Sequence, residues 1–279
     1  MENLQSEDMA QLSSSRLLNR IVPQEDAEEL YRIYPDLPRN HLTGCPSCGK
    51  NNGYGLDGVL ELDGTMVKCN CHDQLQRHKH YLNAGIGATY QFVTWKDFVG
   101  DQNALGSVVS WVNSLESNVE AGRGLYIWSS VNGTGKTMLG ALALKECVMF
   151  GYRCYMTTFQ NMLSSLKSGW HDAEFDRWYR GKVDSAQVLM IDDVGKELMQ
   201  TGGFNNEFAR QTLDSLLRTR VQQARPTIFT SNLSPGQLQP QYGQAVMSLL
   251  TENTYEVAVD GTDFRPSYTS RLKGHRRVY

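Results

Sequence analysis

The nine residues SSVNGTGKT, at positions 129–137, constrain this chain more than any other stretch. They follow the apolar run GLYIW at 124–128 and lead into the apolar run TMLGALALKECVMF at 137–150. A strand that enters a glycine-rich turn and leaves it as a helix directs backbone N–H groups and a helix N-terminus at one point, where an anion binds well. We therefore predict a phosphate-binding loop and a helix that begins near Lys136.

The residue types in this loop suit a nucleotide with a bound Mg²⁺ ion. Lys136 is expected to reach the β- and γ-phosphates, and the Thr137 hydroxyl to bind the metal. Gly133 and Gly135 leave out Cβ atoms that would crowd the phosphates. Ser130 stands where the usual pattern has its first glycine, and a serine can end a strand through local side-chain hydrogen bonds. The predicted nucleotide-binding residues are Ser130, Asn132, Gly133, Thr134, Gly135, Lys136, Thr137, Met138 and Asp192.

Two further apolar runs end in polar side chains. VLMIDD at 188–193 ends in a carboxylate pair, and such groups are costly to bury unless they meet a metal or a donor. We expect Asp192 to hold the Mg²⁺ beside Thr137, and Asp193 to polarise an attacking water. PTIFTSN at 226–232 places Asn232 where it could orient that water, although Ser-Asn before LSPG is also a good turn.

The second half of the chain alternates short β-rich runs with helical stretches. The predicted strands are LYIW, CYMTT, VLMID, PTIFTS and YEVAVDG, and helices are expected to start near Lys136, Phe159, Phe204 and Gln244. Two earlier helices are predicted at 73–87, ended by glycine, and at 103–120. This alternation is typical of an α/β fold whose parallel sheet has helices on both faces.

These elements, in this order, resemble the AAA+ ATPases, and among them the DnaC/DnaI-type helicase loaders. The resemblance rests on NGTGKT, VLMIDDVG, RTRVQQARPTIFTSNLS and DFRPSYTSRL, and it extends to YLNAGIGATYQFVTWKDF upstream. It implies a P-loop core of five parallel strands without a separate C-terminal lid domain, and slow ATP hydrolysis. It also implies assembly as a homo-oligomer on a DnaB-type replicative helicase with single-stranded DNA. The implied catalytic residues are Lys136, Asp193, Asn232 and Arg271, the last as a second sensor.

Two positions depart from the family pattern. Asp193 stands where many AAA+ proteins have Glu, and its shorter side chain suggests slow, switch-like hydrolysis. Leu249 stands where loaders carry an arginine that completes a neighbour's site. Either Arg218 or Arg220 takes that role, or the chain does not complete a neighbour's site in the usual way.

Four cysteines lie close together upstream, as Cys45, Cys48, Cys69 and Cys71. CPSCG is a zinc-knuckle pattern, because proline and glycine shape a turn that presents two thiolates to one metal. CNC is tighter than the usual spacing, so His72 is an alternative fourth ligand. Four protein ligands predict a structural Zn²⁺ site. Cys147 and Cys154 stand alone in apolar runs and are expected to pack as small core residues.

Composition adds bounds on compartment and organisation. The formal net charge of −3 gives no global positive field, so any DNA contact depends on local patches such as RHKHY and the terminal RLKGHRRVY. The N-terminus lacks the pattern of a secretory signal and no run is long enough to span a membrane, so a cytoplasmic location is expected (the host cytoplasm if the gene is viral). The predicted organisation is a polar arm at 1–40, a zinc module at 41–75, a helical linker at 76–120 and the ATPase domain at 121–279.

Three other functions are compatible with parts of this pattern. An ATPase helper of DNA transposition, of the IstB type, shares the core but usually lacks the cysteine module. A P-loop kinase needs an arginine-bearing lid and an acceptor pocket, and no such insertion is visible. A weakly hydrolysing nucleotide-switch adaptor with a zinc module is kept open by Leu249.

The cysteine module gives a direct test. Metal analysis of the purified chain is expected to find about one zinc per chain, because four thiolates fill a tetrahedral site. A Cys45→Ser, Cys48→Ser double variant should lose that zinc, whereas Cys147→Ser should keep it. A folded wild-type chain without metal would contradict the module.

Overall fold

The computed structural model describes residues 59–62, 64–68, 80–91, 93–168, 172–196 and 206–264. Upstream of the core, β1 (Val59–Leu62) and β2 (Thr65–Lys68) pair antiparallel as a hairpin. The cysteines of the predicted zinc module, His72 and Arg271 lie outside the described residues. Among the residues that are described, no helix is both long enough and apolar enough to cross a bilayer.

A five-stranded parallel sheet forms the centre of the molecule. Its strands are β3 (Gly124–Trp128), β4 (Cys154–Thr158), β5 (Val188–Val194), β6 (Thr227–Ser231) and β7 (Thr254–Ala258). They are arranged in the order β4-β5-β6-β3-β7, and every neighbouring pair is parallel. All five predicted strands are therefore confirmed, as is the α/β class with five parallel strands.

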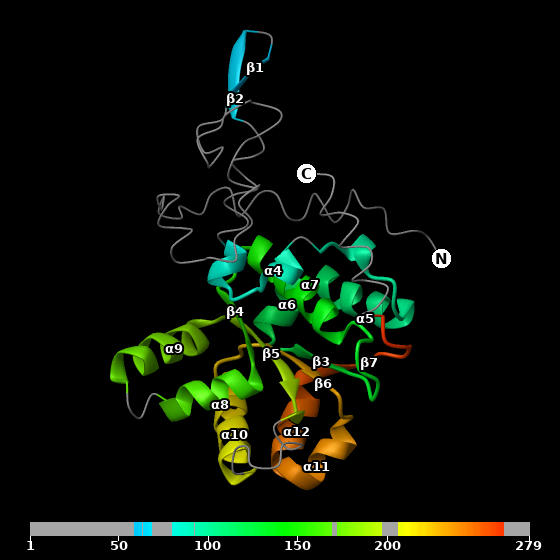
Figure 1. Ribbon diagram of the computed structural model, residues 1–279, viewed down its shortest axis with the longest axis vertical. Coiled ribbons are helices and arrows are strands. Elements are labelled where there is room, and N and C mark those ends of the chain that lie inside the picture. Colours follow the sequence, from blue (N-terminus) through cyan, green and yellow to red (C-terminus); the bar gives the residue numbers. More distant parts are fainter. Residues whose placement is uncertain are drawn as a thin grey trace.

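Helices cover both faces of this sheet. Figure 1 shows α5 (Gln102–Asn113), α6 (Leu115–Glu120) and α7 (Lys136–Met149) on one side, and α10 (Asn206–Gln222), α11 (Pro235–Tyr242) and α12 (Gln244–Asn253) on the other. On the second side, α8 (Phe159–Ser168) also packs on β5, with α9 (Ala173–Ser185) beside it. Leu125 and Ile127 of β3 pack in the core between the sheet and α5 and α7. Tyr126, between them in sequence, packs in the core on the other face, with α10 and α12. Burial on both faces explains why the strands are continuous apolar runs rather than alternating patterns.

Several helices differ from the sequence expectation. The helix predicted at 103–120 is two helices, because the chain bends at Ser114 (φ −105°, ψ 27°) between α5 and α6. The helix α11 was not expected from the sequence, yet Ser234 and Gln237 form a capping box around Pro235 at the first helical turn. The helix α9 was also missed. Residues 80–83 are the described end of the helix expected at 73–87, and Gly85, with φ of 71°, follows it.

A buried lysine fastens the segment before the core onto α7. The Lys145 ammonium donates to the carbonyls of Tyr90 (3.1 Å), Gln91 (3.0 Å) and Val93 (2.5 Å), at and just beyond α4 (Ala88–Gln91). Beside it, Trp95 Nε1 donates to Glu146 at 2.9 Å. The cation lies in low dielectric, where carbonyl dipoles replace water. These contacts hold the segment around Tyr90, Val93 and Trp95 along the helix that follows the phosphate loop.

A buried arginine closes the opposite end of the sheet. Arg220 is 3% exposed and donates to the Thr227 hydroxyl at 2.7 Å and to the carbonyls of Ala186, Gln187 and Pro226 at 2.9–3.1 Å. Burial lowers the pKa of Arg220 to about 10. These partners lie where β5 and β6 begin. Arg220 is therefore used within its own chain and does not fit the expected role in a neighbour's site.

Replacing Arg220 should destabilise the protein. Arg220→Met keeps the apolar stem but leaves buried carbonyls and a hydroxyl without their donor, which should cost about 2–4 kcal/mol of unfolding free energy. Arg218→Met is the matched control, because Arg218 is exposed and pairs only at the surface with Asp214 (2.9 Å), so its loss should cost less than about 1 kcal/mol. Urea unfolding measures both. Equal stabilities would contradict the assigned role.

Candidate nucleotide-phosphate site

The order of the strands brings the predicted site residues to one edge of the sheet. β5, β6 and β3 are adjacent and parallel, so their carboxyl ends meet. The phosphate loop follows β3, the carboxylate pair ends β5, and Asn232 follows β6. Ligands of open α/β sheets bind at such an edge, where neighbouring connections leave in different directions.

The loop between β3 and α7 has the conformation that its glycines allow. Gly133 and Gly135 have φ of 77° and 97°, a region that other residues rarely adopt, and Gly135 is the N-cap of α7. Lys136 is 6% exposed, and its ammonium donates to the carbonyl of Val131 at 2.9 Å. The cationic side chain thus folds back along the loop.

The variant serine at the start of the loop carries no backbone strain. Ser130 is exposed and is not among the described non-glycine residues with positive φ. The turn is stabilised by its neighbour, since the buried Ser129 accepts a hydrogen bond on Oγ from the N–H of Val131 (3.3 Å). The position therefore does not require glycine.

Two side chains from distant parts of the chain pack on the loop glycines. A Cβ on Gly135 would lie 2.6 Å from the ring of Phe98, and one on Gly133 would lie 1.8 Å from Oδ1 of Asp263. The N–H of Phe264 also donates to the carbonyl of Gly133 at 3.1 Å. The glycines are thus needed for close approach as well as for their backbone angles.

A buried carboxylate connects the loop helix to the sheet. Asp192 is 8% exposed, and its Oδ1 accepts hydrogen bonds from the hydroxyls of Thr137 (2.9 Å) and Thr230. Burial raises the pKa of Asp192, and the nearby charge of Asp193 adds to this, whereas the two hydroxyl donors oppose it. Carboxylate and hydroxyl oxygens are the ligands that Mg²⁺ prefers, so Thr137 and Asp192 fit the predicted metal.

The second carboxylate leaves the strand ladder. The β5–β6 register shifts between Ile191 and Val194, and Asp193 has φ of 60°. Its N–H donates to the Thr230 hydroxyl at 3.0 Å, and its carboxylate pairs with Lys196 at 3.0 Å. Asp193 is half-buried, so it is held beside Asp192 but is accessible from solvent.

The turn after β6 is fixed by a buried serine. Ser231 donates from Oγ to the carbonyl of Val194 (2.6 Å) and accepts from the N–H of Leu233 (3.0 Å). Asn232 between them is half-buried at the carboxyl end of β6. The turn expected from the sequence is therefore present, and it places Asn232 at the same edge as the carboxylate pair.

Comparison with known families decides the classification. Residues 88–265, more than half of the chain, match the model of the IstB-like ATP binding protein family. The chain belongs to this family.

Curated relatives of this IstB-like chain include two named as replicative helicase loaders. It is similar to DnaI of Bacillus subtilis, with 29% identity over 159 residues that cover 56% of this chain and 48% of DnaI. It is also similar to DnaC of Escherichia coli, with 20% identity over 205 residues that cover 72% of this chain and 78% of DnaC. The match thus spans about half of DnaI and most of DnaC.

Solved structures support the fold of the IstB-like core. The crystal structure of the DnaC helicase loader aligns with a TM-score of 0.50 at 23% identity, over 58% of this chain and 91% of that one. The replication initiator DnaA, bound to AMPPCP and single-stranded DNA, aligns with a TM-score of 0.50 at 19% identity, over 67% of this chain and 56% of that one. At these identities the likeness shows the α/β fold with its parallel sheet and nothing about activity.

Other sequence expectations have mixed outcomes in the IstB-like core. Cys147 is fully buried, as expected of a core residue, and Cys154 is half-buried.

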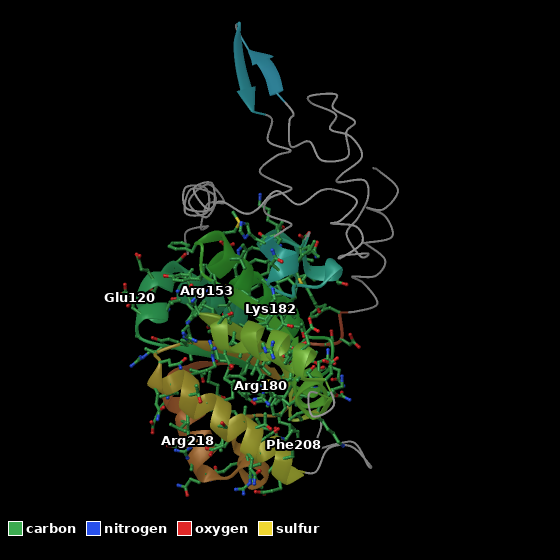
Figure 2. The ribbon with its side chains drawn as sticks, turned by 90° about the vertical axis from the view of Figure 1, so that its left-hand side faces the viewer. Glu120, Arg153, Arg180, Lys182, Phe208 and Arg218 are labelled. Carbon is green, nitrogen blue, oxygen red and sulfur yellow. The ribbon has the colours of Figure 1, made fainter. Side chains whose placement is uncertain are left out.

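Leu249 lies half-buried on α12, which carries no arginine. Arg218 lies on the outer side of α10 (Figure 2). Its guanidinium forms an ion pair with Asp214 at 2.9 Å. Within the described ranges, no group of three or more His, Cys, Asp or Glu side chains is placed to hold a metal.

Sequence reasoning missed four residues of the site. Thr230 bridges the carboxylate pair, Ser129 supports the loop, and Phe98 and Asp263 pack on its glycines. Thr230 could have been suspected, because it precedes Asn232 by two positions in a strand beside the carboxylates. Phe98 and Asp263 carry no comparable signal, since their contacts join segments far apart in sequence.

Proposed function

We propose that this chain is an ATP-dependent loader that delivers a ring-shaped replicative helicase onto DNA. The observation that carries the proposal is the Thr137–Asp192 pair, held beside the phosphate loop and Lys136 at one edge of the sheet. The names of the curated relatives support the choice of helicase loading over other uses of this ATPase core. Binding to single-stranded DNA and oligomerisation on a DnaB-type helicase are part of the proposal.

The roles of the site residues follow from their places. Lys136 would release the Val131 carbonyl and bind the β- and γ-phosphates, while the loop N–H groups and the start of α7 hold the same anion. Thr137 and Asp192 would hold Mg²⁺, which neutralises charge on the β- and γ-phosphates when bound. Asn232 would orient the attacking water. Arg271 remains a proposed second sensor in the segment beyond Phe264.

The ion pair of Asp193 favours slow hydrolysis. Asp193 is the group expected to polarise the water, and its carboxylate pairs with Lys196 at 3.0 Å. This contact engages a carboxylate oxygen that would otherwise accept a hydrogen bond from the attacking water. If contact with a helicase or DNA draws Lys196 away from Asp193, the rate of turnover would depend on that partner. This agrees with the role of ATP as a switch.

One alternative has a specific observation in its favour. The family model that matches is that of the IstB-like proteins, so an ATPase helper of DNA transposition shares this core. A third reading, a weakly hydrolysing adaptor with a zinc module, differs from the loader mainly in turnover. The helper and the adaptor would both bind ATP without forming a stable complex with a replicative helicase.

Co-purification with a replicative helicase tests the proposal. The wild-type chain is expected to form a complex whose stability changes when ATP is added, and Lys136→Ala should abolish ATP binding and that response, because the loop loses its cation. Lys96→Ala is the control, since Lys96 is an exposed cation outside the loop.

The outcomes separate the parts of the proposal. Unchanged ATP affinity in Lys136→Ala would contradict the site assignment. ATP binding without any helicase complex would contradict the loader function but keep the ATPase. A complex with transposase instead would favour the transposition helper.

A further inference from the structure

One threonine contacts both carboxylates of the site. Thr230 lies in β6 with a fully buried side chain. Its hydroxyl donates to Oδ1 of Asp192 and accepts from the N–H of Asp193 at 3.0 Å. A hydroxyl has a single proton to donate, and Asp192 receives it, while a lone pair receives the amide. Its two bonds therefore run in opposite directions and join the two acidic residues.

The backbone at Asp193 depends on this contact. Among the described residues, only Asp193 and Ala224 combine a side chain with positive φ. Aspartate tolerates this region better than most residues, but an acceptor for its N–H is still required in a buried strand end. The register shift between Ile191 and Val194 removes the ladder partner that would otherwise serve, and Thr230 supplies the replacement.

The methyl group of Thr230 has a separate, purely packing role. A Cβ on Gly140 of α7 would lie 3.4 Å from Thr230 Cγ2, which is ordinary contact. The methyl therefore faces α7 while the hydroxyl faces the end of β5. Valine would keep the shape of this side chain and lose only its two hydrogen bonds.

From these contacts we infer that Thr230 is a positioning residue for ATP hydrolysis. It orients Asp192 toward the metal held with Thr137, and it fixes the backbone turn that presents Asp193 to the attacking water. Resting on the proposed function, this assigns a role to a residue that does not itself touch the nucleotide. Loss of the hydroxyl should affect turnover and Mg²⁺ dependence more than affinity for the nucleotide.

Thr230→Val and Thr230→Ser form the test pair. Valine should lower kcat about 10- to 100-fold and leave the KM for ATP within about threefold, as expected when positioning rather than binding is lost. It should also raise, by about tenfold, the Mg²⁺ concentration needed for half-maximal binding of a fluorescent ADP. Serine keeps the hydroxyl and should restore both values to within about threefold of wild type.

The results that would overturn this role are distinct. Wild-type kcat and Mg²⁺ dependence in Thr230→Val would overturn this role and leave the proposed function standing. A serine variant as impaired as valine would also overturn it, because the hydroxyl alone would then not account for the effect. If valine prevents folding, as judged by urea unfolding, Thr230→Ala gives the same comparison with serine. A wild-type protein without turnover, even with a replicative helicase and single-stranded DNA present, would overturn the proposed function as well.

The segment after β7 carries a second, independent feature. Past β7, the N–H of Val259 donates to the carbonyl of Trp128 (2.8 Å) and that of Asp260 to Oδ2 of Asp101 (3.0 Å). The chain then reaches the phosphate loop, where Phe264 binds the carbonyl of Gly133 and the Asp263 carboxylate fills the space above Gly133 Cα.

The geometry points to Asp263 as a built-in competitor of the nucleotide phosphates. A carboxylate placed against Gly133 of an anion-binding loop repels a polyphosphate that approaches that loop. Nucleotide binding would displace the Asp263 carboxylate and break the hydrogen bond between the Phe264 N–H and the Gly133 carbonyl. The segment that carries Arg271 would then respond to whether a nucleotide is bound. This also rests on the proposed function.

Asp263→Asn and Asp260→Asn are the matched variants, because each removes one negative charge from the same exposed segment. Asp263→Asn should bind a fluorescent ADP about fivefold more tightly than wild type at low salt, with a smaller difference at high salt, whereas Asp260→Asn should stay within about twofold. Equal or weaker binding by Asp263→Asn would overturn the competitor role. Absence of binding by all three proteins would overturn the proposed nucleotide site too.

Discussion

The buried Asp192 carboxylate is the interaction on which the site depends. Removing such a group from water is unfavourable, and two hydroxyl hydrogen bonds, from Thr137 and Thr230, offset that cost. The donors come from α7 and β6, while the acceptor comes from β5. The carboxylate is satisfied only when these three elements are correctly packed, so assembly of the sheet and assembly of the site are one event.

The two ends of the sheet serve different purposes. Where β5 and β6 begin, all three guanidinium nitrogens of Arg220 donate hydrogen bonds to carbonyls or to a hydroxyl. These bonds stabilise this end of the core. At the carboxyl ends, the ladder is interrupted between Ile191 and Val194, and backbone and side-chain groups are turned toward the phosphate loop. Stability and chemistry are therefore separated along the strand direction, as is common in parallel α/β sheets.

The phosphate loop is contacted by segments from both ends of the core. Phe98 reaches Gly135 from the segment that Lys145 fastens to α7, and Asp263 reaches Gly133 from the chain after β7. An ATP-driven loader needs its partner-binding parts to respond to the nucleotide, and contacts on the loop glycines provide a physical route for such coupling. This arrangement suits the switch that we propose better than rapid hydrolysis, in keeping with the Asp193–Lys196 pair.

The sequence by itself determined the strands, the parallel α/β class, the phosphate loop with Lys136 and Thr137, and the position of Asp192, Asp193 and Asn232 at the carboxyl ends of β5 and β6. These follow from local rules: apolar runs, glycines in a turn, and polar residues at strand ends. Only the tertiary structure decided that Arg220 is a core residue and that Thr230, Phe98 and Asp263 belong to the site. Each of these depends on contacts between residues far apart in the chain, which no local pattern of residue types encodes, because they arise only when strands of fixed order bring their ends together.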